Sequence, residues 1–488
     1  MPAPSESKMH AIQETRDRAP KTLIVTVQPQ LRSNAEQESS IQELERLART
    51  LGLDVVGVES QKRTNASPST YVGPGRLKEI ARMTGGSGHI PTHGQQEEED
   101  DDVYLNDIEP IDVDLVLVND TLSPRLHRTL EHALGREVLD RTGLILEIFE
   151  KRARTREAKI EIEIARLNYE LPRLRDSRLM RGREGGGGGR GEQGNTVIAL
   201  GKGRIRARIA QLESELEQVR AATVARKRQR HGIFQVALVG YTNAGKSSLM
   251  RGLSGSEVLV EDKLFATLGT TARQLEPPTS PPVVLSDTVG FIQELPHELV
   301  ASFRSTLDEA ADADLVLLVL DASDPSWRDH LEVTRETLAS IDVDERRIRI
   351  VFNKCDQLEE RARLSLRALW PGSLQTSAHD RSELERLRDE ITATRDRGLC
   401  REHLLLPFVR GELRAELFAH ANVLEEEHCE WGTRFTLRAS HGNLDRWFNM
   451  LAEDLVFDED FVSELDDGAP STERILEFAW RRGLELVT

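Results

Sequence analysis

Cysteine is scarce in this chain of 488 residues, which contains only Cys355, Cys400 and Cys429, with no paired spacing. This scarcity excludes a disulfide framework and a cysteine-based zinc site, and it favours a reducing compartment. Long apolar runs are also missing, so no segment has the length of a membrane-spanning helix. The polar start MPAPSESKMH lacks the apolar core of a signal peptide. We therefore expect a cytoplasmic protein.

Basic residues are outnumbered, with 65 Lys and Arg against 83 Asp and Glu, which gives a formal net charge of −18. The exception is residues 151–230, which carry 21 Lys and Arg against 10 Asp and Glu. A charge run usually marks a solvated helix pair. Because the rest of the chain is acidic, this basic island instead favours contact with RNA.

Glycine is concentrated in the segment REGGGGGRGEQGN at residues 183–195, which has five glycines in a row. Such a run predicts a loop without regular structure. The flanking sequences have helical composition, with Ile160, Ile164 and Leu167 at helical spacing. We predict a basic antiparallel helical hairpin at residues 143–231, whose Arg/Gly tip is suited to probing structured RNA.

The most specific motif is GYTNAGKSS at residues 240–248, which fits the phosphate-loop pattern G-x-x-x-x-G-K-S. It lies between a strand-like run and a helix-like one. Gly240 and Gly245 would let successive backbone N–H groups point at phosphates, at the positive end of the helix. Lys246 would then reach the β- and γ-phosphates, and the Ser247 hydroxyl would complete a Mg²⁺ shell.

A second motif, DTVG, ends the strand-like segment PVVLSD. Asp287 is predicted to hold the same Mg²⁺ through water, and the Gly290 N–H would sense the γ-phosphate. Phe291 follows, where Ras-like GTPases carry the glutamine that orients the attacking water. Because a phenyl ring cannot do so, we expect slow hydrolysis until a partner or an ion completes the site.

Asn243 lies inside the phosphate loop. It resembles the asparagine with which several GTPases that lack the glutamine help to bind K⁺ near the phosphates. The alternative is that Asn243 only suits a tight turn.

A third motif, NKCD at residues 353–356, predicts which base of the nucleotide the site binds. Asp356 can accept two hydrogen bonds from the N1–H and N2 amino groups of guanine, while Asn353 approaches the opposite edge. Adenine would leave the carboxylate unpaired, at a cost of roughly 1–3 kcal/mol. Ser377 and Ala378 follow a further short strand, and a backbone N–H there is predicted to meet the guanine oxygen. The three motifs together predict a site for GTP and GDP.

The remaining sequence predicts two further folded regions. KTLIVTVQ, LDVVGVES and VDLVLVND are strand-like and indicate an α/β region before the hairpin. Within that region YVGPGR (residues 71–76) is interpreted as a turn, since a lone G-x-G is weak evidence for a second nucleotide site. An acidic, polar stretch at about 84–110 predicts a disordered insertion. LLLPFVRGELRAEL and WGTRFTLRAS predict a small α+β domain after the phosphate-loop domain.

Several segments together resemble the HflX family of translational GTPases: YVGPGRLKEI, DRTGLILEIFEKRARTREAK, GYTNAGKSSL, FATLGTTAR, DTVGFIQELPHELVASFRSTL and LVLLVLDAS. The resemblance implies a multidomain α/β protein with a P-loop GTPase domain of Ras-like doubly wound topology. It also implies binding to the large ribosomal subunit near the peptidyl-transferase centre, dissociation or rescue of ribosomes, and a monomer away from the ribosome.

The resemblance assigns Thr267 as the switch threonine that closes on Mg²⁺ and the γ-phosphate. The candidate catalytic residues are then Lys246, Thr267 and Gly290, and the metal ligands are Ser247 and Thr267. The candidate nucleotide-binding residues are Gly240, Tyr241, Thr242, Asn243, Ala244, Gly245, Lys246, Ser247, Ser248, Phe265, Ala266, Thr267, Leu268, Gly269, Asp287, Thr288, Val289, Gly290, Asn353, Lys354, Cys355, Asp356, Ser377 and Ala378.

The sequence predicts a disordered arm at residues 1–20 and an N-terminal α/β domain at 21–142. The hairpin follows at 143–231 and the GTPase domain at 232–398. A C-terminal α+β domain with an acidic tail covers 404–488. The hairpin tip departs from the GPGETQLE of many family members, so its RNA contacts do not transfer residue by residue. Two other functions stay open: a ribosome-assembly GTPase, and a nucleotide-gated RNA-binding or signalling switch in which hydrolysis only times release.

Overall fold

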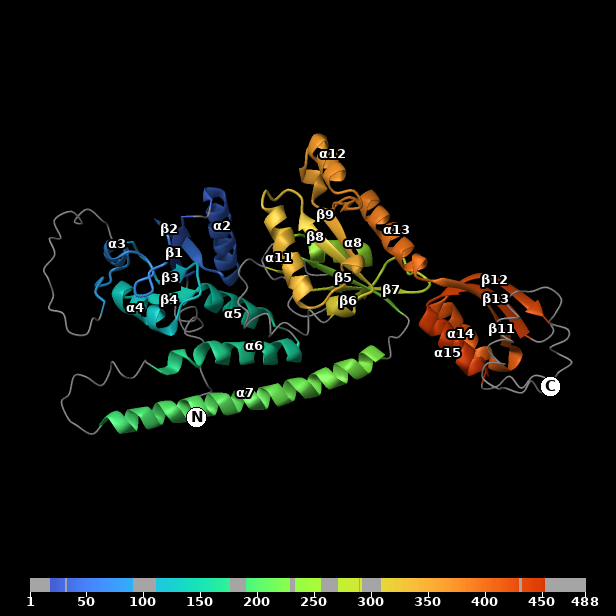
Figure 1. The fold of residues 1–488 in the computed structure, drawn as a ribbon, viewed down its shortest axis with the longest axis horizontal. Helices are drawn as coiled ribbons and strands as arrows, with labels where there is room; N and C mark the ends of the chain where they lie inside the picture. Colours follow the sequence, from blue (N-terminus) through green and yellow to red (C-terminus); the bar gives the residue numbers. More distant parts are fainter. Residues whose placement is uncertain are drawn as a thin grey trace.

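The computed structural model describes residues 18–30, 33–90, 111–153, 155–175, 190–228, 233–255, 271–288, 290–291, 309–429 and 432–452. Three sheets, of four, six and three strands, follow one another along an elongated molecule (Figure 1). The predicted multidomain α/β fold is confirmed. No helix within these described ranges is long and apolar enough to cross a bilayer.

The first sheet is entirely parallel and has the order β2-β1-β3-β4. Its strands are β1 (Lys21–Pro29), β2 (Asp54–Arg63), β3 (Leu115–Val118) and β4 (Glu137–Asp140). Seven consecutive residues of β1 are buried, as expected of a central strand that is covered on both faces. Strand β4 was not predicted from the sequence, because four residues beginning with a glutamate give too short an apolar signal.

Four helices cover the first sheet: α2 (Asn34–Leu51), α3 (Pro74–Thr84), α4 (Pro124–Leu134) and α5 (Arg141–Arg152). Helices α2 and α5 share one apolar core with the sheet, and α3 and α4 share the core on the opposite face. Helix α5 falls inside the stretch predicted as hairpin, but it packs in the sheet's core. The hairpin of the structure therefore begins with the next helix.

The turn predicted at residues 71–76 is partly helical, because α3 begins at Pro74 with Gly73 as its N-cap. Proline suits this first position, where the helix needs no N–H donor. The start of the predicted disordered insertion is also ordered: a Cβ atom at Gly86 would clash with the Leu134 backbone. Residues 91–110, and with them the acidic run, lie outside the described residues.

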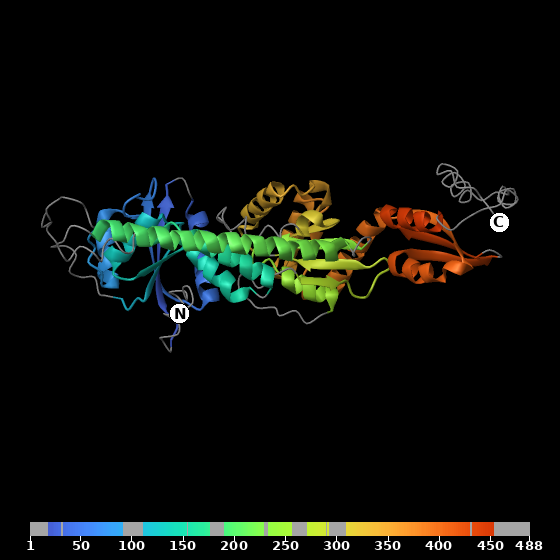
Figure 2. The ribbon, with the colours of Figure 1, turned by 90° about the horizontal axis from the view of Figure 1, so that it is seen from below.

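The hairpin consists of α6 (Arg156–Glu170), the short 3-10 helix η2 (Arg173–Arg175) and α7 (Arg190–Arg228). Helix α7 has 39 residues and runs beside α6 from the first sheet towards the second (Figure 2). It starts inside the segment predicted to lack regular structure, so that prediction is wrong for residues 190–195. Each glycine costs only about 1 kcal/mol in a helix, and extending a helix is far easier than nucleating one.

The second sheet has the order β10-β9-β8-β5-β7-β6, parallel except for β6 against β7. Its strands are β5 (Phe234–Gly240), β6 (Thr271–Gln274), β7 (Val283–Asp287), β8 (Leu315–Asp321), β9 (Ile348–Asn353) and β10 (Leu374–Gln375). Apolar cores lie on both faces, formed with helices α8 (Lys246–Ser254), α11 (Trp327–Ser340), α12 (Glu360–Leu369) and α13 (Arg381–Arg397). The doubly wound topology agrees with the prediction.

The third sheet is antiparallel, with β13 between β11 and β12. Its elements are β11 (Cys400–Pro407), α14 (Gly411–His420), β12 (Asn422–Cys429), β13 (Gly432–Ala439) and α15 (His441–Ala452). The two helices and the sheet enclose a core centred on Trp447, which is fully buried. The C-terminal tail from residue 453 lies outside the described residues.

Candidate functional site

Two glycines fix the path of the loop that joins β5 to α8. Gly240 and Gly245 have φ angles of 149° and 90°, which disfavour any side chain. A Cβ atom at Gly240 would clash with the carbonyl oxygen of Val319, and one at Gly245 would clash with the Asn353 amide. Asn243 also has a positive φ of 63°. The loop therefore has the tight, close-packed backbone that a phosphate cradle needs.

Lys246 is buried beneath this loop. Its ammonium donates to the carbonyl oxygens of Gly240 and Tyr241, at 3.0 and 2.9 Å. Burial lowers the pKa of Lys246 to about 8, and the nearby Asp287 carboxylate opposes this shift. Two uncharged carbonyl oxygens thus hold the ammonium beneath the loop. A bound phosphate, which is a stronger acceptor, would compete with them for it.

The Ser247 hydroxyl donates to Asp287 Oδ2 at 2.7 Å. This bond joins the start of α8 to the end of β7. A hydroxyl and a carboxylate at this separation are the hard oxygen donors that suit Mg²⁺. The residues present therefore fit the predicted metal.

The DTVG segment packs directly against the phosphate loop. The Phe291 N–H donates to Gly240 O at 3.1 Å, and the Thr242 N–H donates to Phe291 O at 2.8 Å. The Phe291 side chain is only 4% exposed and belongs to the apolar core. Thr288 Oγ1 donates to Leu238 O at 2.8 Å. The phenyl ring therefore lies in the apolar core and offers no group that could orient water.

The NKCD segment begins at the end of β9 and lies beside the phosphate loop. Asn353 Nδ2 donates to Ala244 O at 2.8 Å, and Lys354 Nζ lies 2.7 Å from Asp321 Oδ2. Asn353 Oδ1 is buried without a partner in the described chain. Cys355 is buried, whereas Asp356 is exposed. An unsatisfied amide oxygen and an exposed carboxylate at one edge suit a ligand with donor groups.

The structure brings most of the candidate residues to one edge of the second sheet. The Cys355 N–H donates to Thr376 O at 3.2 Å, which places Ser377 and Ala378 next to the NKCD segment. Ser377 is buried, and its Oγ accepts from the His379 N–H at 3.2 Å. The described candidates at this edge are residues 240–248, 287, 288, 290, 353–356, 377 and 378. Residues 265–269, including Thr267, and Val289 lie outside the described residues.

Sequence reasoning missed a contact on the outer side of the phosphate loop. The Tyr241 ring stacks on the His330 ring of α11, with centroids 3.7 Å apart and planes 12° apart. Burial lowers the pKa of His330, while Asp324 opposes the shift. No local signal in the sequence could connect two residues that lie so far apart along the chain.

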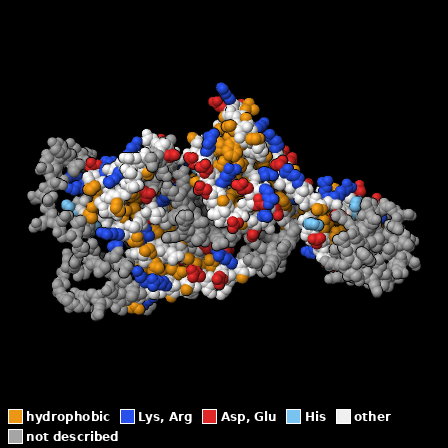
Figure 3. Space-filling view, in the orientation of Figure 1, with side chains coloured by type: hydrophobic (Ala, Val, Ile, Leu, Met, Phe, Trp, Pro, Cys, Tyr) orange, Lys and Arg blue, Asp and Glu red, His pale blue; other side chains and the backbone are white. Residues whose placement is uncertain are grey.

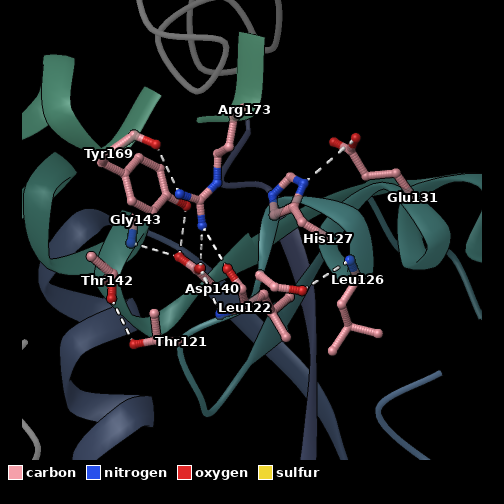
Figure 4. Close-up of polar contacts among 11 residues, drawn as sticks. Thr121, Leu122, Leu126, His127, Glu131, Asp140, Thr142, Gly143, Tyr169 and Arg173 are labelled. Atoms are coloured by element: carbon pink, nitrogen blue, oxygen red, sulfur yellow. Dashed lines mark hydrogen bonds and ion pairs between the residues drawn. The ribbon is translucent and has the colours of Figure 1, made fainter. Parts of the chain in front are cut away.

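A second polar cluster, also missed, fastens the hairpin to the first sheet (Figure 4). Asp140 is fully buried at the end of β4 and accepts from the N–H groups of Leu122 and Gly143, at 3.0 and 2.8 Å. It also accepts from Tyr169 Oη at 2.7 Å and Arg173 Nη2 at 2.9 Å. Asp140, Tyr169 and Arg173 are called the latch below.

The latch leaves little freedom around it. The Arg173 guanidinium carbon lies 3.4 Å from the centre of the Tyr169 ring. A Cβ atom at Gly143 would lie 2.9 Å from Tyr169 Oη, so this close approach requires glycine. Burial lowers the pKa of the neighbouring His127, while the Glu131 and Asp140 carboxylates oppose the shift. The cluster therefore fixes where α6 leaves the first domain.

A glycine-shaped phosphate cradle, a buried lysine and a serine–aspartate pair on a doubly wound sheet define a P-loop nucleotide-binding protein. Three family profiles match the chain: "50S ribosome-binding GTPase" over residues 235–354, "GTP-binding GTPase Middle Region" over 152–230, and "GTP-binding GTPase N-terminal" over 38–90 and 98–150. The GTPase HflX of Gluconacetobacter diazotrophicus is 43% identical over 454 residues, which cover 90% of this chain and 99% of the relative.

The GTPase HflX of Magnetococcus marinus is 38% identical, over 84% of this chain and 89% of the relative. A solved GTP-binding protein of Sulfolobus solfataricus, in complex with GDP, is 25% identical and has a TM-score of 0.39, over 77% of this chain and 98% of that one. The chain belongs to the HflX family of GTPases, as its motifs predict. It is a guanine-nucleotide-binding, GTP-hydrolysing enzyme.

Proposed function

We propose that this GTPase binds the large ribosomal subunit in its GTP form and dissociates or rescues ribosomes in the cytoplasm. The observation that carries the proposal is the match of residues 235–354 to a family described as a 50S ribosome-binding GTPase. The same chain joins this domain to a basic hairpin, through which it can contact ribosomal RNA. A switch and an RNA-binding arm in one molecule are what a nucleotide-controlled ribosome factor needs.

The proposed nucleotide site follows from the geometry of the loop edge. Backbone N–H groups of the phosphate loop and Lys246 would hold the β- and γ-phosphates. Ser247 would bind Mg²⁺ directly and Asp287 through water, with Thr267 as the further ligand that the family resemblance implies. Bound Mg²⁺ would neutralise charge on the phosphates.

The base site and the monovalent ion complete this proposal. Asp356 would select guanine, and the unsatisfied Asn353 Oδ1 would accept from the nucleotide. The Asn243 side chain would help to hold K⁺. Its positive φ also fits the simpler role of making the turn.

Ion pairs within the hairpin support a choice among its arginines as the proposed RNA contacts. Three arginines of the hairpin form ion pairs within it: Arg156 with Glu215 at 2.7 Å, Arg208 with Glu163 at 2.9 Å, and Arg220 with Glu161 at 2.9 Å. In Figure 3 basic and acidic side chains accordingly lie together along the hairpin. Arg204 and Arg206 are exposed on α7 and make no ion pair within the described chain. These two arginines are the proposed RNA contacts.

Sedimentation of purified ribosomes with this protein tests the proposal. With a non-hydrolysable GTP analogue, we expect the protein to migrate with the large subunit and the 70S peak to shrink. With GDP the protein should stay at the top of the gradient. Equal distributions with GTP analogue and GDP would contradict the proposal. Preference for precursor subunits over mature ones would favour the assembly alternative.

A further inference from the structure

A cavity of about 390 Å³ lies where α2 of the first domain meets the phosphate loop. Five residues of α2, among them Glu43 and Arg46, line one side. The other side is lined by Tyr241 to Ala244 and by the segment that follows β8. At the rim, Ser39 Oγ and Ser326 Oγ lie 3.1 Å apart and join the two domains. The cavity therefore belongs to both domains.

The phosphate-loop wall of this cavity adjoins the groups that are proposed to bind the γ-phosphate. A Cβ atom at Gly290 would lie 2.9 Å from Thr242 Cγ2 and 3.0 Å from Lys246 Nζ. Gly290 and Lys246 are the groups proposed to bind the γ-phosphate, so Thr242 is its neighbour. Thr242 is 7% exposed, and its Oγ1 has no hydrogen-bond partner within the described ranges. A polar group entering through the cavity would meet an unsatisfied hydroxyl beside the γ-phosphate.

Among the described residues that line the cavity, Arg46 is the one whose side chain is always positively charged at neutral pH. Two acidic side chains of the lining already have partners, since Glu43 lies 3.2 Å from buried Arg141 and Asp321 pairs with Lys354. Arg46 itself is exposed and forms no ion pair with any described residue. Its guanidinium is therefore available to a ligand.

We propose that Arg46 is a catalytic residue supplied by the first domain to the GTPase site, where its guanidinium contacts γ-phosphate oxygens. The inference rests on the proposed nucleotide site. A guanidinium presents a planar fork of donors that matches phosphate oxygens. During hydrolysis of GTP and water to GDP and phosphate, charge on these oxygens changes most in the transition state, so a cation there accelerates the reaction. Arg46 is neither consumed nor deprotonated.

This role also accounts for the core position of Phe291. A site without a water-positioning glutamine depends more on charge stabilisation, which an arginine provides. Because the Ser39–Ser326 contact joins the two domains in the isolated chain, Arg46 acts in the free protein and needs no ribosome.

The test compares full-length parent protein with R46A and R46K, without ribosomes. For R46A we expect single-turnover hydrolysis to slow roughly 20-fold, the ratio between switch GTPases with and without an arginine in cis. The affinity for a fluorescent GDP should be unchanged. R46K should recover only part of the rate, because an ammonium lacks the planar fork.

A second readout does not depend on turnover. GDP with aluminium fluoride imitates the transition state, and we expect the parent to capture it in the presence of MgCl₂ and KCl, whereas R46A should not. Arg49→Ala is the matched control. Arg49 lies one turn further along α2, is 69% exposed and pairs with Glu45 at 3.2 Å. This variant should behave like the parent in both assays.

Three outcomes would overturn the proposal. R46A could hydrolyse GTP at the parental rate and still capture aluminium fluoride. R46A could lose GDP affinity as strongly as it loses rate, which would make Arg46 a ground-state binding residue. The parent could bind GDP and yet fail to capture aluminium fluoride. A parent that does not bind GDP at all would instead contradict the proposed nucleotide site, so the two failures are distinguishable.

Discussion

The Lys246 ammonium is buried in the free protein, and its pKa of about 8 lies within the range of an ordinary binding experiment. Bound phosphates would hold this group charged and raise its pKa again. Affinity for GDP should therefore be fully present below pH 8 and fall as the pH rises through 8. Between pH 7 and pH 8.5 we expect a loss of roughly fourfold.

Fluorescence titration with a labelled GDP at several pH values measures this dependence. Calorimetry in buffers of different ionisation enthalpy should also show proton uptake on binding near pH 8. A flat affinity over this range would mean that Lys246 stays charged in the free protein. Keeping the upper limit at pH 8.5 avoids most of the titration of guanine itself.

Asp356 gives a second prediction at the scale of one residue. Its exposed carboxylate is proposed to accept two hydrogen bonds from guanine. Asp356→Asn should weaken GDP binding by about 100-fold, because the amide keeps only one of the two acceptor oxygens and a hydrogen bond to a charged group contributes about 1.5–3 kcal/mol. The same variant should bind xanthosine diphosphate better than the parent does. Competition between the two nucleotides is the measurement, and equal affinity of the parent for ADP and GDP would reject the assignment.

Residues differ in how far the sequence alone locates them. Gly240, Lys246, Ser247 and Asp287 were predicted correctly to lie together, because each motif carries its own backbone requirement. The stack of Tyr241 on His330 and the position of Arg46 in the lining of the cavity were not predicted. Both depend on how separate elements dock, and side-chain type at one position contains no information about that.

Among the elements, the latch holds the hairpin to the first sheet, and its weak point is the buried charge of Asp140. Asp140→Asn would leave the Arg173 guanidinium without its counter-charge in a largely buried site. Removing one partner of a buried pair costs about 3–5 kcal/mol. We expect this variant to lose thermal stability and to exchange amide hydrogens faster in α6.

Asp344→Asn provides the matched control, because the Asp344–Arg346 pair is on the surface. An ion pair at the surface contributes little to stability, so no measurable change is expected there. If both variants behave like the parent, another contact fixes the hairpin. If Asp140→Asn loses stability without faster exchange in α6, the latch supports the first sheet only.

The hairpin itself gives a prediction about salt. Arg204→Gln with Arg206→Gln should weaken binding to large subunits and flatten its dependence on KCl, since fewer counterions are released. Arg156→Gln with Arg208→Gln removes the same charge from residues that pair with Glu215 and Glu163. This control should affect the packing of α6 on α7 more than the salt slope. Equal effects from the two double variants would show that only net charge matters.

The sequence also predicted elements unequally well. The long apolar strands β1 and β5 were found because continuous burial leaves a strong pattern. The short strand β4 and the start of α7 were not found, because pairing with neighbours and helix extension outweigh weak local preferences.

For the whole molecule, the buried Phe291 predicts a slow enzyme. Without ribosomes we expect GTP turnover on the order of 10⁻⁴–10⁻² s⁻¹, and large subunits should raise it. Phosphate release measured with and without purified subunits tests this. Fast turnover of the free protein would require a water-positioning group that lies outside the described residues.

Helix α7 is long enough to convert a small tilt at one end into a large displacement at the other. At 1.5 Å per residue its 39 residues span about 58 Å. One end lies near the GTPase domain and the other lies at the far end of the hairpin (Figure 2). If the end near the GTPase domain tilts by about 10°, the far end moves by about 10 Å for a helix of this length. A movement of a few ångströms at the bound nucleotide would thus become a larger movement at the end of the hairpin that is proposed to contact RNA.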